Sequence, residues 1–261
     1  MFLEYLNLYR EPLFWLFPVG SVVTSAVAFM LFAGPMTWIA ATAPASLERY
    51  RIQRRRPRAQ DLVGPSIKWW AINNLTLLAV VVLAWPLLRL SGVHAGPLPP
   101  WYVIVLQLIF FVYLDDFLFY WAHRTLHGQF LYKRIHGWHH TILTPWAVTG
   151  HYMHPLEYVI TGTVALVGPV LVGAHVVTLW LWFAFRQWEA AEGHCGYDFP
   201  WSPTHFFPLS DGAIHHDVHH ERVKGNYAGF FPWTDAFFGT LSRGYREEVE
   251  TRHPWVRAVA R

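Results

Sequence analysis

The sequence contains a single cysteine, Cys195, and few charged residues. One cysteine excludes an intrachain disulfide and a zinc or iron–sulfur site built from several thiolates. Charged residues make up 14% of the 261 residues, and the net charge of +3 is too small to favour nucleic acid as a partner. The chain also lacks a Gly-x-Gly-x-x-Gly fingerprint and any flavin motif, so we expect electrons for redox chemistry to come from a separate donor.

Long apolar runs take the place of the missing charges. Hydrophobic residues make up 54% of the chain, and four stretches carry almost no charge, at residues 12–47, 73–88, 101–114 and 158–185. A membrane-spanning helix needs about 20 apolar residues. The fifteen tryptophans fit the same interpretation, because their amphipathic rings settle at membrane interfaces. The pattern predicts an all-α, multi-pass integral membrane protein.

Charge between the apolar stretches indicates the orientation. Basic residues cluster at 49–58, and the positive-inside rule places such a loop on the cytoplasmic side. Two further crossings then return the chain to that side near His123, so residues 123–157 are expected to be cytoplasmic. The fold predicted is a transmembrane helical stem with a cytoplasmic helical cap that holds a histidine-rich di-metal site.

The last apolar stretch, 158–185, is long for one crossing and short for two. Gly168, Pro169 and Gly173 offer a break near its middle. We therefore expect a helical hairpin that dips into the membrane or barely spans it, so that the residues after it rejoin the cap.

Histidine is the most informative residue type, because neutral imidazole is the commonest protein metal ligand. Fourteen of the sixteen histidines lie between residues 123 and 220. His123 and His127 are four residues apart and therefore share one helix face. Asp116 and Tyr120 continue that stripe and are candidate catalytic residues. We expect Asp116 to accept the spare N–H of a ligating histidine, although an arginine could instead pair with Asp115 or Asp116.

Two further clusters each contain a His-x-x-His-His pattern, which places the first imidazole on the same helix face as the other two. With His123 and His127 they supply eight imidazoles, too many for one ion and about right for two. The metal is open between iron and zinc, because imidazole binds both. The candidate ligands in these clusters are His136, His139, His140, His215, His216, His219 and His220.

The remaining histidines differ in context. His194 follows the last apolar stretch and could complete a ligand set, and His154 could be a ligand or the partner of one. His151 could equally be a loop histidine. The isolated histidines are expected to be structural or interfacial, namely His94, His175, His205 and His253.

From about residue 115 to 240 the chain resembles the fatty acid hydroxylase and sterol desaturase superfamily. The matching segments are 116–127 (DFLFYWAHRTLH), 136–140 (HGWHH), 194–202 (HCGYDFPWS), 215–220 (HHDVHH) and 225–240 (GNYAGFFPWTDAFFGT). Segments 194–202 and 215–220 look most like those of cholesterol side-chain hydroxylases and methylsterol oxidases. The resemblance divides a single membrane domain, 1–261, into transmembrane helices (1–114), a catalytic region (115–241) and a tail (242–261).

The resemblance implies two irons, dioxygen as oxidant, and an external electron donor such as a cytochrome b5-like protein or a ferredoxin with its reductase. The implied reaction is hydroxylation or desaturation of a lipid, and the resemblance favours a sterol-like substrate. A zinc-dependent membrane hydrolase is the alternative, in which a metal-bound water attacks the lipid. The implied ligands are His123, His127, His136, His139, His140, His194, His216, His219 and His220.

Overall fold

The computed structural model describes residues 7–53, 60–207 and 210–252, and helices make up its regular structure. Within these ranges there is no strand, and the β-type pairing consists of two isolated bridges, Arg51 with Tyr197 and His94 with His175. The basic loop 49–58 and the tail 242–261 are therefore described only in part, and His253 lies outside the described residues.

In the part of the chain that the structure describes, three helices are long and apolar enough to cross a membrane. The first begins with α2 (Pro12–Phe14), continues through the π-helical turn η2 (Trp15–Val19), and ends with α3 (Gly20–Thr42). The others are α4 (Val63–Leu88) and α5 (Trp101–Leu126). Their outer faces expose leucine, valine and tryptophan side chains, as expected for lipid contact. The prediction of a multi-pass helical membrane protein is confirmed.

The predicted hairpin consists of α7 (Pro155–Leu171) and α8 (Val176–Gly193). The chain turns at Gly173, which has a positive φ of 57°, whereas Gly168 and Pro169 remain inside α7. A Cβ at Gly173 would lie 3.0 Å from the carbonyl oxygen of Gly92, so the turn also needs glycine for a close backbone approach. At about 1.5 Å per residue each arm is shorter than the roughly 30 Å hydrocarbon layer.

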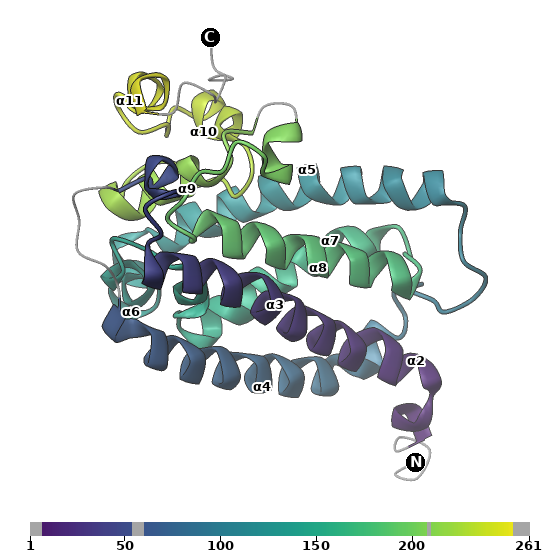
Figure 1. Ribbon diagram of the computed structural model, residues 1–261. Coiled ribbons are helices and arrows are strands. Elements are labelled where there is room, and N and C mark those ends of the chain that lie inside the picture. The colour runs from purple at the N-terminus through teal and green to yellow at the C-terminus, as the bar shows by residue number, and fades with distance from the viewer. Residues whose placement is uncertain (1–6, 54–59, 208–209, 253–261) are drawn as a thin grey trace.

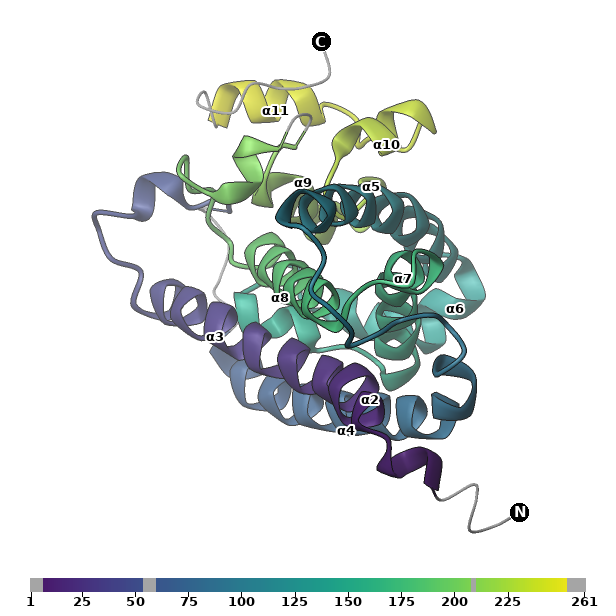
Figure 2. The same ribbon diagram turned by 90° about the vertical axis from the view of Figure 1, so that its right-hand side faces the viewer.

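The long helices lie side by side, with the hairpin among them (Figure 1). Helix α8 packs along α3, and α7 packs against α4 and α5. Figure 2 shows α7 and α8 between α5 on one side and α3 and α4 on the other. Two buried indoles fix the packing, since Trp85 donates to the Leu8 carbonyl and Trp182 to the Ala165 carbonyl, both at 2.8 Å. The hairpin thus forms the interior of the stem.

Short elements gather beyond one end of the stem, where α3 and α5 finish (Figure 1). Asp235 organises part of this cap, because its carboxylate accepts hydrogen bonds from the amides of Tyr227 and Ala228 and from the Thr240 hydroxyl. The short elements of the cap are α6 (Gln129–Arg134), η5 (His136–Thr141), η6 (Ala147–His151), η7 (Pro203–Phe206), α9 (Ala213–Arg222), α10 (Pro232–Phe237) and α11 (Tyr245–Arg252).

Candidate metal centre

Nine imidazoles meet in two groups where the cap joins the stem. The ligand atoms of each group lie within 4.8 Å of one another. The first histidine group is His123, His127, His136, His140 and His219. The second histidine group is His139, His194, His216 and His220.

Four elements supply these side chains. The last turn of α5 provides His123, and His127 caps that helix. The 3-10 helix η5 and the helix α9 each contribute three imidazoles, and His194 is the residue at which α8 ends. Segments far apart in the sequence therefore converge only because the hairpin brings the chain back to the end of α5.

The two His-x-x-His-His segments are used in opposite ways. In η5, His136 and His140 belong to the first group and His139 to the second. In α9 the relation is reversed, because His216 and His220 belong to the second group and His219 to the first. A shared helix face therefore does not bring the three imidazoles of a segment to a single group. Each segment lies between the two groups and contributes to both.

Hydrogen bonds fix which ring nitrogen faces the centre. Nδ1 of His123 lies 2.7 Å from the Tyr227 carbonyl oxygen, and Nδ1 of His219 lies 2.7 Å from that of Gly225. A carbonyl accepts only, so each Nδ1 carries the proton and each Nε2 presents a lone pair. The same arrangement holds at His139, His194 and His220, whose carbonyl partners are Tyr152, Ala190 and Ile142.

The converging Nε2 atoms fit a bound metal ion. His136 Nε2 lies 3.0 Å from that of His123, 3.0 Å from that of His127 and 2.9 Å from that of His140. Lone pairs cannot hydrogen-bond to one another, whereas a cation satisfies all of them. Ligands at right angles around an ion, with bonds of about 2.1 Å, are about 3.0 Å apart, against about 3.4 Å in a tetrahedron. The five converging imidazoles of the first group could together hold one cation.

Burial keeps these imidazoles neutral, as metal ligation requires. Desolvation lowers the pKa of His136 to about 3 and that of His139 to about 4. The pKa of His194 is lowered to about 3, again mainly by burial. Near pH 7 these rings are therefore uncharged and available to a cation.

Glu157 is a site residue that sequence reasoning missed. Its Oε1 lies 2.6 Å from Nδ1 of His136, and both side chains are buried. A carboxylate in this position fixes the ring's tautomer and orientation and raises its basicity. The available signal was an acidic residue three positions after His154, at the start of an apolar stretch.

The role expected for Asp116 needs correction. Its carboxylate accepts hydrogen bonds from the amides of Phe230 and Phe231 and from the Thr234 hydroxyl, rather than from a histidine. The reason is geometric, because this face of α5 packs against the segment leading into α10. The arginine alternative holds for Asp115, whose Oδ2 accepts from Arg186 at 3.0 Å.

Tyr120 also lies apart from the two groups. Its fully buried hydroxyl is 3.0 Å from Thr240 Oγ1 and accepts from Arg124 at 2.9 Å. Tyr120 does not line the cavity described below. Its observed contacts tie α5 to the cap, as those of Asp116 do, and a catalytic role for either residue has no support in this geometry.

Two candidate ligands fall outside both groups. Nδ1 of His154 accepts from the Leu156 amide at 3.1 Å and so caps α7. Nε2 of His215 lies 3.3 Å from Asp235 Oδ2, because its side chain leaves α9 on the side away from both groups. Of the eleven histidines expected as ligands, the structure brings nine together.

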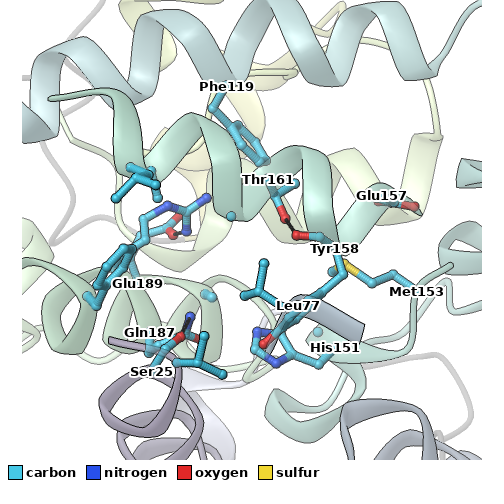
Figure 3. A pocket seen from close by; sticks show the side chains of 18 of the residues that line it. Ser25, Leu77, Phe119, His151, Met153, Glu157, Tyr158, Thr161, Gln187 and Glu189 are labelled. Atoms are coloured by element: carbon cyan, nitrogen blue, oxygen red, sulfur yellow. Dashed lines mark hydrogen bonds and ion pairs between the residues drawn. The ribbon is translucent and has the colours of Figure 1, made fainter. Parts of the chain in front are cut away.

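A cavity that is partly open to the outside lies beside both groups. His123 and His136 of the first group line it, as do His139, His194 and His216 of the second. Its remaining wall is largely apolar and comes from α3, α4, α5 and the hairpin. Figure 3 shows part of this wall, and the side chains of Leu77 and Phe119 point into the cavity. A hydrophobic molecule in the cavity would reach the imidazoles directly.

Comparison with known proteins gives consistent matches. A family model described as fatty acid hydroxylase matches residues 108–240. Methylsterol monooxygenase 2-2 of Arabidopsis thaliana is 38% identical over 235 residues, which cover 87% of this chain and 86% of that protein. A very-long-chain aldehyde decarbonylase of Oryza sativa is 45% identical over 185 residues, which cover 67% and 69%. No solved structure matches the chain.

Proposed function

The chain belongs to the fatty acid hydroxylase family, and on that basis we propose that this oxygen-dependent membrane oxidoreductase hydroxylates or desaturates a sterol-like lipid with two irons. The observation that carries the proposal is the junction of two imidazole groups with one apolar cavity. The similar methylsterol monooxygenases support a sterol-like substrate.

The first histidine group would hold one iron and the second histidine group the other. When bound, the iron pair supplies dioxygen activation and oxidation of an unactivated C–H bond. Glu157 orients His136 by accepting its Nδ1–H. The backbone carbonyls of Tyr227 and Gly225 hold His123 and His219 in the same way.

The stem contributes substrate position and exclusion of water. Apolar side chains of α4, α5 and the hairpin surround the cavity, so a lipid entering it loses its contact with water and gains hydrophobic stabilisation. The carbon that reacts must lie at the cavity end lined by the imidazoles. Hydroxylation and desaturation both begin with abstraction of a hydrogen atom at this end of the cavity. The histidines therefore do not distinguish the two reactions, and the carbon that the cavity presents there decides whether an alcohol or a double bond forms.

The electron donor is proposed to be a separate protein that docks on the cap, on the cytoplasmic side of the membrane. The basic cluster at 49–58 supports this orientation. Arg222, Lys224 and Arg243 of the cap are candidates for contact with an acidic carrier or with anionic lipid head groups. The catalytic region in this proposal spans residues 115–241.

The test combines metal analysis of the purified protein with conversion of a sterol panel, supplied with a reductase and an electron carrier. Two irons per chain and an oxygen-dependent product, either one oxygen heavier or two hydrogens lighter, are expected. Zinc as the bound metal, with hydrolysis that continues without oxygen, would instead establish the metal-dependent hydrolase.

A further inference from the structure

Helix α10 buries its polar residues and exposes its apolar ones. Thr234 and Asp235 are fully buried, and both make hydrogen bonds to other parts of the protein. Trp233 and Ala236 are partly exposed, and Phe237 exposes 77% of its surface. A helix on a water-facing surface shows the opposite distribution, with its polar side chains outward. The outward face of α10 is therefore suited to apolar surroundings.

The position of α10 along α5 shows which surroundings it meets. Phe231, just before α10, stacks on Tyr113 with the ring centroids 5.0 Å apart, and Phe238, just after it, stacks on Tyr120 at 5.0 Å. The helix thus runs beside the second half of α5, on the side away from α4 (Figure 1 and Figure 2). Tyr113 precedes the end of α5 at Leu126 by about 20 Å along the helix axis. Helix α10 therefore reaches back along the stem.

Two exposed tryptophans mark the limits of the lipid-facing part of α5. Trp101 exposes 76% of its surface and Trp121 exposes 41%, and tryptophan is enriched at both membrane interfaces. The helix between them is about 30 Å long, which matches the thickness of the hydrocarbon layer. Arg124, whose guanidinium lies 5.6 Å from the Trp121 ring centroid, is exposed one turn nearer the cap, where a cation reaches the lipid head groups. The part of α5 that α10 contacts thus lies in the leaflet nearest the cap.

The exposed aromatic surface of α5 continues without a break onto α10. The ring of Phe238 lies 6.5 Å from that of Phe117 and 5.0 Å from that of Trp121. On its other side it lies 5.0 Å from the ring of Phe237. A continuous exposed apolar patch marks contact with a membrane or with another protein. Continuity with the lipid-facing side of a spanning helix favours the membrane.

We propose that α10 is seated in the membrane, at the boundary between the acyl chains and the head groups of the leaflet nearest the cap. The face formed by Trp233, Ala236 and Phe237 contacts lipid, whereas Thr234 and Asp235 hold the helix to the protein. The cap is thereby anchored in the bilayer beside the stem. The inference goes beyond the proposed function, because it holds whatever reaction the protein catalyses.

The experiment places a nitroxide spin label at position 237 of the full-length protein in lipid nanodiscs. Phe237→Cys provides the accessible thiol, because the single native cysteine, Cys195, is buried. Collisions with oxygen, which concentrates among acyl chains, are compared with collisions with a water-soluble nickel complex. Leu106→Cys, exposed on α5, is the control for lipid, and Glu247→Cys, exposed on α11, is the control for water.

The ratio of oxygen to nickel collisions at position 237 is expected to be several-fold higher than at position 247 and no higher than at position 106. A label at Ala236→Cys, on the same face, should give a similar ratio. A ratio at position 237 equal to that at position 247 would place α10 in water and overturn the proposal. Protection of position 237 from both reagents would show that a protein surface covers it, such as a second copy of the chain, and would also overturn the proposal.

Discussion

Glu157 Oε1 lies 2.6 Å from Nδ1 of His136, and both side chains are buried at the junction of η5 and α7. The pair joins the hairpin to the first histidine group. Helix α7 therefore both orients an imidazole of the first histidine group and lines the cavity.

Replacing Glu157 should weaken metal binding without removing a ligand. In Glu157→Gln the amide oxygen can still accept from His136, but the negative charge that raises its basicity is lost. We expect iron affinity to fall by about 10- to 100-fold, measured by competition with a chelator. Glu11→Gln, which changes a carboxylate paired with Arg89 far from the cap, is the control. Equal iron affinity in both variants would remove Glu157 from the site.

His219→Ala removes an imidazole of the first histidine group and should abolish oxygen-dependent turnover. Iron content should fall, while the protein stays in the membrane fraction because the three spanning helices are unchanged. His205→Ala, whose imidazole belongs to neither group, should retain two irons. Full activity in His219→Ala would exclude His219 as a ligand.

Gly150→Ala should disturb the second histidine group by crowding it. A Cβ there would lie 2.8 Å from Nδ1 and 3.0 Å from Cγ of His194, closer than real contacts allow. The ring must move, so we expect a reduced iron content and lower turnover. Gly193→Ala is the matched control, because its nearest neighbour is His216 Cβ at 3.4 Å. A similar iron content in both variants would show that His194 tolerates displacement.

Asp116→Asn should reduce stability more than it reduces metal binding. The carboxylate accepts two amide bonds and the Thr234 hydroxyl, and an asparagine NH2 would face at least one of these donors. An unmet buried donor costs about 1–3 kcal/mol, which should lower the unfolding temperature in detergent. A loss of iron as large as that in His219→Ala, without destabilisation, would instead support a role at the metal.

His205 should make the stability of the cap depend on pH. Burial lowers the pKa of His205, but its 2.8 Å hydrogen bond to Asp198 and the negative charges of Asp198, Glu192 and Asp211 together raise the pKa above its usual value. A raised folded pKa gives stability that is complete below the unfolded pKa and is lost as pH rises through the folded value. The free energy of unfolding, wild type minus His205→Gln, should therefore be larger at pH 6 than at pH 9. A difference that grows with pH would contradict this assignment.

Composition and spacing predicted the membrane helices, the hairpin and all nine imidazoles of the two histidine groups. These features depend on local sequence, namely apolar length, helix breaks and four-residue spacing. The partition of the nine imidazoles depends on how η5 and α9 face each other across the cap, which no local pattern contains. Glu157 was missed for the same reason, because its partner His136 is 21 residues away in the chain.

Asp116 shows the opposite error. It lies on the same stripe of α5 as His123, and the spacing was correct, but the side chain turns toward the amides of residues 230 and 231. Sequence periodicity predicts which residues share a helix face, but it does not predict which segments of the protein pack against each part of that face.

Each His-x-x-His-His segment contributes imidazoles to both histidine groups. This shared contribution limits which sequence changes the protein can tolerate. An inserted or deleted residue rotates the following residues of the helix by about 100° in α9 and by about 120° in η5, which is a 3-10 helix. Because each segment contributes to both histidine groups, such a change would misplace ligands of both at once. Single substitutions can alter one centre, whereas insertions and deletions act on the pair. The two centres are therefore expected to be inherited, and lost, as one unit.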